Sequence, residues 1–163
     1  MTSFLQAKAG DSIELARLAD KIWRQHFTPI IGESQVSYML QHFQSPEAIA
    51  RFISEGYEYF FIIFDSKNIG YFAVQNRQDH LHLSKFYILE QFRGLGHGKN
   101  TLNFIIQKAQ KDNLTSLRLV VNKDNSATIR AYEKMGFHKI AAPVTDIGGG
   151  YVMDDYEFEL KIY

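Results

Sequence analysis

The sequence predicts a three-layer α/β sandwich in which helices pack on both faces of a mixed sheet of about seven strands. Segments with strand-like and helix-like patterns alternate along all 163 residues, in the order β-ααα-ββ-β-α-β-α-β-β. Hydrophobic residues make up 45% of the chain, which is enough for a substantial core. The sequence has no repeat, low-complexity stretch or linker, so a single domain is expected over residues 1–163.

The N-terminal part is expected to hold one strand, at 3–9, followed by three helices. Asp11 and Glu14 have the spacing of a capping box at the start of the first helix, and Ser45-Pro46 has the pattern of a helix start for the third. Apolar residues recur at helical spacing in all three segments. They are Leu15, Leu18, Ala19 and Ile22, then Val36, Met39, Leu40 and Phe43, then Ile49, Phe52 and Ile53.

The rest of the chain is expected to alternate between strands and helices. The short turn between the first two strands of this part predicts a hairpin. A helix with Leu102, Ile105, Ile106 and Ala109 on one face follows the third of them, and a second helix at 126–135 stops at Gly136. The expected strands are 57–65, 68–75, 80–89, 116–122, 137–147 and 151–162.

Composition excludes several kinds of site. The chain has no cysteine, which excludes disulfides, thiolate metal sites and a cysteine acyl carrier. Its longest apolar run, Tyr59–Phe64, is far too short to span a membrane, so no membrane partner is expected. The N-terminus lacks the basic start and apolar core of a secretory signal, and a cytoplasmic location is therefore expected.

Charge is balanced overall but unevenly distributed. Residues 80–139 hold ten Lys and Arg against four Asp and Glu, a net charge of +6. Residues 1–79 hold seven against nine, or −2, and residues 140–163 hold one against five, or −4. The basic residues of the middle segment are spread over several elements without a nucleic-acid motif, so no nucleic-acid partner is expected.

The stretch RGLGHGK, residues 93–99, places three glycines in five positions directly before an amphipathic helix. Glycines let backbone N–H groups converge, and the first turn of a helix leaves such groups unpaired, so this turn can hold an anion. It is not a P-loop, because Arg93 and Asn100 stand where glycine and Ser or Thr are required. A dinucleotide fingerprint is also excluded, since its third glycine would fall on Lys99 or Thr101.

Arg93, Gly96 and Gly98 fit the pattern Q/R-x-x-G-x-G/A, which resembles the acyl-CoA loop of the GNAT superfamily of N-acetyltransferases. The segment NSATIRAYEKMGF, residues 125–137, resembles the second signature of that family, N-x-x-A-x-x-x-Y-x-x-x-G-F, with Thr128 in place of alanine. The two motifs occur in the family's order, and the order of elements is similar over the whole chain. This resemblance implies a splay between the fourth and fifth strands of the sheet. A narrower resemblance to polyamine acetyltransferases rests on KFYILEQFRGLGHGKNTLN and the N-terminal helices.

The resemblance implies that acetyl-CoA is the co-substrate and that no metal takes part. Its pantetheine arm would enter between the diverging strands, and its pyrophosphate would lie on the glycine turn near Arg93 and Lys99. His97 is expected to face water, the alternative being a bond to phosphate, and Asn125 is expected either to contact pantetheine or to cap its own helix. The residues expected to contact acetyl-CoA are Phe86, Tyr87, Ile88, Arg93, Gly94, Leu95, Gly96, His97, Gly98, Lys99, Asn125 and Tyr132.

Two catalytic groups are implied by the same resemblance. The backbone N–H of Ile88 would stabilise the developing oxyanion, a contribution of about 3 kcal/mol for such a donor. Tyr132 would protonate the departing thiolate, although its helical spacing also suits a core tyrosine with a satisfied hydroxyl. The general base stays open, with His82, Ser84 and Glu33 as candidates.

The expected reaction moves an acetyl group from acetyl-CoA to a primary amine. In the family's architecture the acceptor enters beside the N-terminal helices and the final hairpin, which are the acidic parts of this chain, so a small cationic amine such as a polyamine is expected. Asp154 and Asp155 are adjacent in the last strand, and alternation allows at most one of them to point into the site. A protein or peptide N-terminal amine as acceptor, a CoA-binding module without turnover, and a homodimer stay open.

Overall fold

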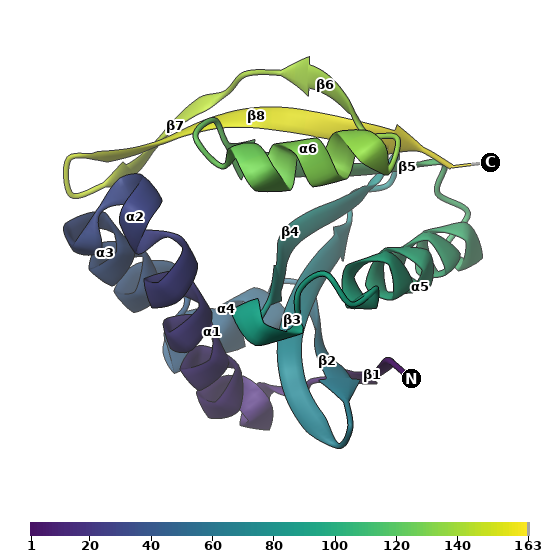
Figure 1. Cartoon of the computed structure of the whole chain (residues 1–163), viewed down its shortest axis with the longest axis horizontal. Helices are drawn as coiled ribbons and strands as arrows, with labels where there is room; N and C mark the ends of the chain where they lie inside the picture. The colour runs from purple at the N-terminus through teal and green to yellow at the C-terminus, as the bar shows by residue number, and fades with distance from the viewer. Residues whose placement is uncertain (163) are drawn as a thin grey trace.

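The computed structural model describes residues 1–162, in which eight strands form a mixed sheet (Figure 1). The strand order is β1-β2-β3-β4-β5-β8-β6, and β7 pairs with β8. The strands are β1 (Ser3–Gln6), β2 (Glu58–Phe64), β3 (Lys67–Asn76), β4 (Leu81–Ile88), β5 (Ser116–Asn122), β6 (His138–Ala141), β7 (Val144–Gly148) and β8 (Tyr151–Lys161). The helices are α1 (Ser12–His26), α2 (Thr28–Ile31), α3 (Glu33–Phe43), α4 (Pro46–Ser54), α5 (His97–Lys111) and α6 (Ser126–Lys134).

The sheet separates two apolar cores, one beneath α1–α4 and the other beneath α5 and α6 (Figure 1). Alternation along β2 sends Tyr59 and Phe61 into the first core and Phe60 and Ile62 into the second. A strand buried on both faces is apolar throughout, which explains the run YFFIIF. The predicted three-layer α/β sandwich is confirmed.

Strands β4 and β5 are parallel neighbours, but they pair over three residues only. The pairs run from Leu81 with Leu117 to Leu83 with Leu119, although β4 continues to Ile88 and β5 to Asn122. Each strand stays paired on its other side, β4 with β3 and β5 with β8, along its whole length. The two strands therefore diverge, as predicted for the fourth and fifth strands, and each edge of the opening is held by a further paired strand.

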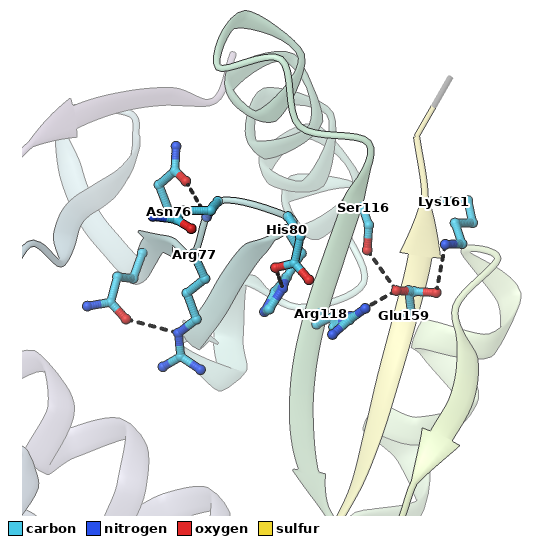
Figure 2. A network of polar contacts seen from close by, with 10 residues as sticks. Asn76, Arg77, His80, Ser116, Arg118, Glu159 and Lys161 are labelled. Atoms are coloured by element: carbon cyan, nitrogen blue, oxygen red, sulfur yellow. Dashed lines mark hydrogen bonds and ion pairs between the residues drawn. The ribbon is translucent and has the colours of Figure 1, made fainter.

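A polar network joins β5 to β8 beside the closed end of this opening (Figure 2). Glu159 on β8 accepts hydrogen bonds from Arg118 Nε at 2.8 Å and from Ser116 Oγ at 2.9 Å, both on β5. Lys161 Nζ lies 3.3 Å from the other carboxylate oxygen. The bond from Arg118 is the main reason that the pKa of Glu159 is lowered to about 2, so this carboxylate is ionised at any physiological pH.

The strand count differs from the prediction because the segment expected as one strand at 137–147 forms two. It breaks at Ala142–Pro143 into β6 and β7, which pair with different parts of β8. Proline has no N–H to donate to a strand ladder, so Pro143 interrupts the pairing. Strand β1 also ends earlier than expected, at Gln6, and a short 3₁₀ turn leads into α1.

The predicted capping box at the start of α1 is wrong. The Asp11 carboxylate accepts the backbone N–H of Lys8 at 2.8 Å, which stabilises the preceding 3₁₀ turn instead of α1. Glu14 accepts a hydrogen bond from Arg17 on the helix surface.

Among residues 1–162, no helix has the length and apolar character needed to cross a membrane.

Gly70 on β3 permits a close approach of β4. A Cβ added at Gly70 would lie 2.2 Å from Tyr87 O and 3.0 Å from the Cα of Ile88. The Tyr87 carbonyl therefore points to β3, as does the N–H of Leu89, which donates to Ile69 O at 2.8 Å. Since alternate peptide groups of a strand point to opposite sides, the N–H of Ile88 points away from β3 and into the opening.

We expect Gly70→Ala to lower the free energy of unfolding by about 1–3 kcal/mol, because the added methyl group cannot fit without moving β4. Urea denaturation would measure this. Gly10→Ala is the matched control, since a Cβ at Gly10 meets nothing within 4 Å and its backbone is unstrained. Equal midpoints for the two variants would show that the close approach does not constrain β4.

Candidate active site

A cavity of about 680 Å³ occupies the opening between β4 and β5 and extends beneath α1, α3 and α4. Residues of α6 and of the β7–β8 hairpin complete its walls. This volume is typical of sites for small molecules and cofactors. The structure places eight of the predicted site residues in its lining. They are Phe86, Tyr87, Ile88, Arg93, Gly94, Gly98, Asn125 and Tyr132.

The glycine turn lies at one end of this cavity. Gly96 precedes the first turn of α5, which contains no acidic residue, and a Cβ at Gly94 or Gly96 would meet nothing within 4 Å. A Cβ at Gly98 would meet only the Cδ1 of Ile88, at 3.9 Å. The backbone beside the helix N-terminus is thus open to a ligand, which fits the pyrophosphate of CoA. Leu95 and Lys99 are exposed on the same turn, outside the cavity lining.

His97 does not face water, and that expectation is wrong. Its ring is buried between Phe64 and Phe92, and its Nδ1 is hydrogen-bonded to Thr2 Oγ1 at 2.9 Å. The sequence alone could not predict this contact, because Thr2 lies 95 residues away from His97 in the chain. His97 therefore ties the start of α5 to the N-terminal strand, while its backbone stays part of the glycine turn.

A chain of three polar side chains crosses the mouth of the opening. Arg93 Nη1 donates to Nδ1 of His26 at 3.2 Å, because a guanidinium has no acceptor. The other ring nitrogen of His26, Nε2, then donates to Asn125 Oδ1 at 3.2 Å. Burial and the charge of Arg93 lower the pKa of His26, in keeping with a neutral ring. The Asn125 side chain does not cap α6, so of its two predicted roles the helix cap is not observed.

Tyr132 on α6 has a hydroxyl without a hydrogen-bond partner in the described part of the chain, whereas a core tyrosine would have a satisfied one. The residue is 9% exposed, lines the cavity and packs edge-on against Phe137 at 5.2 Å. Burial raises its pKa, so the phenol stays protonated at physiological pH. Tyr87 and Asp155 line the same cavity, and the charges of Tyr132 and Asp155 both help to raise the pKa of Tyr87.

Asp155 is a second group in the cavity that lacks a partner. Its carboxylate is 4% exposed, and Oδ1 is buried without a hydrogen bond in the described chain. Asp154 points the other way and forms an ion pair with Lys123 at 2.7 Å, so one of the two carboxylates faces the cavity, as alternation predicts. Burial is the main reason that the pKa of Asp155 is raised to about 6.

The three general-base candidates suggested by the sequence are placed less favourably than Asp155 for accepting a proton in the cavity. His82 does not line the cavity, and burial lowers its pKa to about 4. Glu33 is exposed at the start of α3, away from the lining. Ser84 does line the cavity, on β4, but its hydroxyl is not ionised at neutral pH.

The acceptor end of the cavity is mostly aromatic and is covered by the β7–β8 hairpin. Tyr38 Oη on α3 donates to Ile147 O at 2.7 Å, and Gln35 Nε2 donates to Val152 O at 3.0 Å. A Cβ at Gly148 or Gly149, at the hairpin tip, would lie within 3 Å of the Tyr38 side chain, so these two glycines permit the close contact. Besides Asp155, the lining contains the cations Lys85, on β4, and Arg93. The aromatic residues of the lining are Trp23, Phe27, Phe43, Phe52, Tyr57, Phe86, Tyr87 and Tyr132.

Comparison with known proteins matches residues 27–153 to the acetyltransferase (GNAT) domain. Among solved structures, the chain is similar to a PaiA N-acetyltransferase from Thermoplasma acidophilum in complex with coenzyme A, with a TM-score of 0.81 and 20% identity over 99% of both chains. It is also similar to the ribosomal-protein-S18-alanine N-acetyltransferase from Escherichia coli, with a TM-score of 0.74 and 18% identity over 99% of this chain and 94% of that one. An acetyltransferase of the GNAT family from Staphylococcus aureus gives a TM-score of 0.74 and 16% identity over 100% of both chains. These structures share the fold, and because the family match covers most of the sequence, the chain belongs to the GNAT acetyltransferases, which use acetyl-CoA.

Proposed function

We propose that this acetyltransferase moves an acetyl group from acetyl-CoA directly to the primary amine of a small molecule. The observation that carries the proposal is the meeting, in one cavity, of the opening beside Ile88 with Tyr132 and with Asp155, whose Oδ1 has no hydrogen-bond partner within residues 1–162. A direct transfer fits the chain because it has no cysteine to carry the acetyl group.

Acetyl-CoA, when bound, supplies an acetyl group activated as a thioester. Peptide groups of Phe86 that face the opening would pair with the pantetheine arm, as one strand pairs with another. The Ile88 carbonyl already accepts a hydrogen bond from Arg93 Nε at 2.9 Å, which leaves the Ile88 N–H for the acetyl group. The N-terminus of α5, together with Arg93 and Lys99, would hold the pyrophosphate. The open backbone side of the glycine turn supports this placement.

Asp155 would prepare the acceptor for attack. A primary amine with a pKa near 10 is mostly protonated at neutral pH and cannot attack a carbonyl in that form. With a pKa of about 6, Asp155 is ionised at neutral pH, so it can attract the ammonium group and accept a proton from it. The Ile88 N–H would then stabilise negative charge on the acetyl oxygen, and the protonated Tyr132 would donate to the departing sulfur.

The cavity favours an acceptor with one positive charge over the polyamine expected from the sequence. Among the residues that line it, Asp155 is the one carboxylate, and a second ammonium group would meet the positive charge of Lys85. Aromatic walls suit an apolar body. The hairpin bound to α3 favours a small molecule over a protein N-terminus.

A cytoplasmic location and a homodimer are further proposals. Cell fractionation would test the location, and light scattering would test the oligomeric state.

The experiment that tests the proposed function is thiol release from acetyl-CoA with a panel of primary amines. The panel includes a monoamine with an aromatic body, spermidine and a peptide N-terminus, and we expect the monoamine to have the highest kcat/KM. Release of thiol with none of the amines would favour a CoA-binding module without turnover.

We expect Tyr132→Phe to lower kcat by about 10²–10⁴-fold and to change the KM for acetyl-CoA little, because it removes a proton donor and almost no volume. Steady-state kinetics would show this. Phe137→Leu is a control for packing around the same ring, with a small loss of stability and a much smaller loss of kcat. Full activity of Tyr132→Phe at every pH would mean that Tyr132 has only a structural role.

We expect Asp155→Asn to lower kcat/KM for the amine by about 10²-fold or more at pH 7, since the variant cannot accept a proton. For the wild-type enzyme, kcat/KM should fall as the pH drops below about 6, where Asp155 becomes protonated, and this acid limb should be absent in the variant. Asp154→Asn is the matched control, because Asp154 is paired with Lys123 outside the cavity. If both variants behave alike, Asp155 is not the base.

We expect Gly98→Leu to weaken CoA binding at least tenfold, because the side chain would occupy the space open to the pyrophosphate. Folding should tolerate it, since the nearest atom to a Cβ there is 3.9 Å away. Calorimetric titration with CoA gives the affinity, and the melting temperature controls for folding. Unchanged affinity in a folded variant would place the pyrophosphate elsewhere.

A further inference from the structure

The acetyl transfer assigned to Tyr132 and Asp155 makes no use of Lys85, a buried lysine in the wall of the same cavity. Lys85 owes its position to an irregularity in the pairing of β3 with β4. Leu83 is opposite Val74, but Lys85 is opposite Ala73, so Ser84 is an extra residue in β4. The bulge puts Leu83 in the core beneath α5 and turns Lys85 toward α4.

The surroundings of the Lys85 ammonium group are aromatic. Lys85 is 7% exposed, and its Nζ donates a hydrogen bond to Tyr59 Oη at 3.0 Å. Nζ also lies 4.2 Å from the ring centre of Phe52 and 5.6 Å from that of Tyr57. Within residues 1–162, no carboxylate forms an ion pair with it. An ammonium group has three donors, so its hydrogen-bonding capacity is not filled.

A buried charge without a counter-ion is costly, and the aromatic rings offset only part of that cost. Burial alone lowers the pKa of Lys85 to about 7. An anion that entered the cavity would supply the missing partner and favour the charged form again. Lys85 is therefore suited to bind an anionic group that the described residues do not provide.

Lys85 also lies apart from the catalytic groups. The rings around its ammonium group belong to α4 and to the start of β2, whereas Tyr132 lies on α6. Its ammonium group is turned to the aromatic rings near α4, while Asp155 comes from β8 on the far side of the opening. The cavity thus has the carboxylate of Asp155 on one wall and the ammonium group of Lys85 on another, and aromatic side chains surround the ammonium group.

We propose that Lys85 binds the carboxylate of the acceptor, so that the acceptors of this enzyme are amino carboxylates, meaning primary amines that also carry a carboxylate and an apolar body. This inference rests on the proposed acetylation of amines. Asp155 would attract the ammonium end of such a molecule and Lys85 its carboxylate end. Lys85 is then a specificity-determining residue, and it takes no part in proton transfer.

The first test compares amines that differ only in a carboxylate, namely phenylalanine with phenethylamine, tyrosine with tyramine, and 5-aminopentanoate with butylamine. We expect kcat/KM to be at least tenfold higher for the carboxylate-bearing member of at least one pair. Lys85→Met should abolish this preference by raising the KM for that member, with the KM for acetyl-CoA unchanged. Lys108→Met is the matched control, because Lys108 also lies near a ring, that of Phe60, but has Glu58 as a partner at 2.8 Å.

The second test measures binding without turnover. We expect 3-phenylpropanoate to bind the wild-type protein in calorimetric titration at least tenfold more tightly than its neutral amide, 3-phenylpropanamide. Lys85→Met should remove that difference, and Tyr132→Phe should keep it. If Lys85→Met does not fold, the acid and the amide can still be compared on the wild-type protein.

The outcomes separate this inference from the proposed function. Tighter binding of the acid without acetylation of any amine would support the anion site and overturn the proposed function. Better turnover of the amines that lack a carboxylate, with no preference for the acid in binding, would overturn the role of Lys85 and leave amine acetylation standing. A fall in kcat for every amine in Lys85→Met, with an altered pH profile, would make Lys85 a base and also overturn the inference.

Discussion

The site depends on one constraint, which is that β4 and β5 stop pairing after three residues. Peptide groups beyond Leu83 that face the opening have no strand to bond, and unsatisfied backbone groups in a protein interior are costly. A ligand with amide groups of its own can complete the pairing, as we propose for the pantetheine arm of CoA. The opening persists because β3 and β8 hold its two edges, and the Glu159 network strengthens the pairing of β5 with β8.

In the proposed mechanism, the two faces of the sheet bind different substrates. The glycine turn begins α5, which packs on one face, and the basic part of the chain supplies Arg93 and Lys99 there. The other face, beneath α1–α4, carries the aromatic walls and the buried ammonium of Lys85. The opening in the sheet is where the two sides communicate, which lets an anionic co-substrate and an amine reach one another from separate surfaces.

The sequence predicts the elements better than the contacts. Local patterns are enough to predict the layers of the fold, the glycine turn at the start of α5 and the helix that carries Tyr132, because helix periodicity and motif spacing are local properties. For the last strand, alternation alone predicts that at most one of Asp154 and Asp155 points into the site, but not which one. His26 could not be found, since its partners Arg93 and Asn125 lie 67 and 99 residues away. The expectation that His97 faces water is wrong for the same reason. Its burial by Phe64 and Thr2 is decided by tertiary packing.

The orientation of Lys85 could not be predicted for a different reason. A single inserted residue in a strand reverses which face of the sheet the following side chains occupy. Without the bulge at Ser84, strict alternation would place Lys85 with Leu83 in the apolar core beneath α5. With it, β4 directs the backbone N–H of Ile88 into the opening and the side chains of Lys85 and Tyr87 to the opposite face. In the proposed mechanism, one strand therefore contacts both substrates, the co-substrate through its backbone and the acceptor through its side chains.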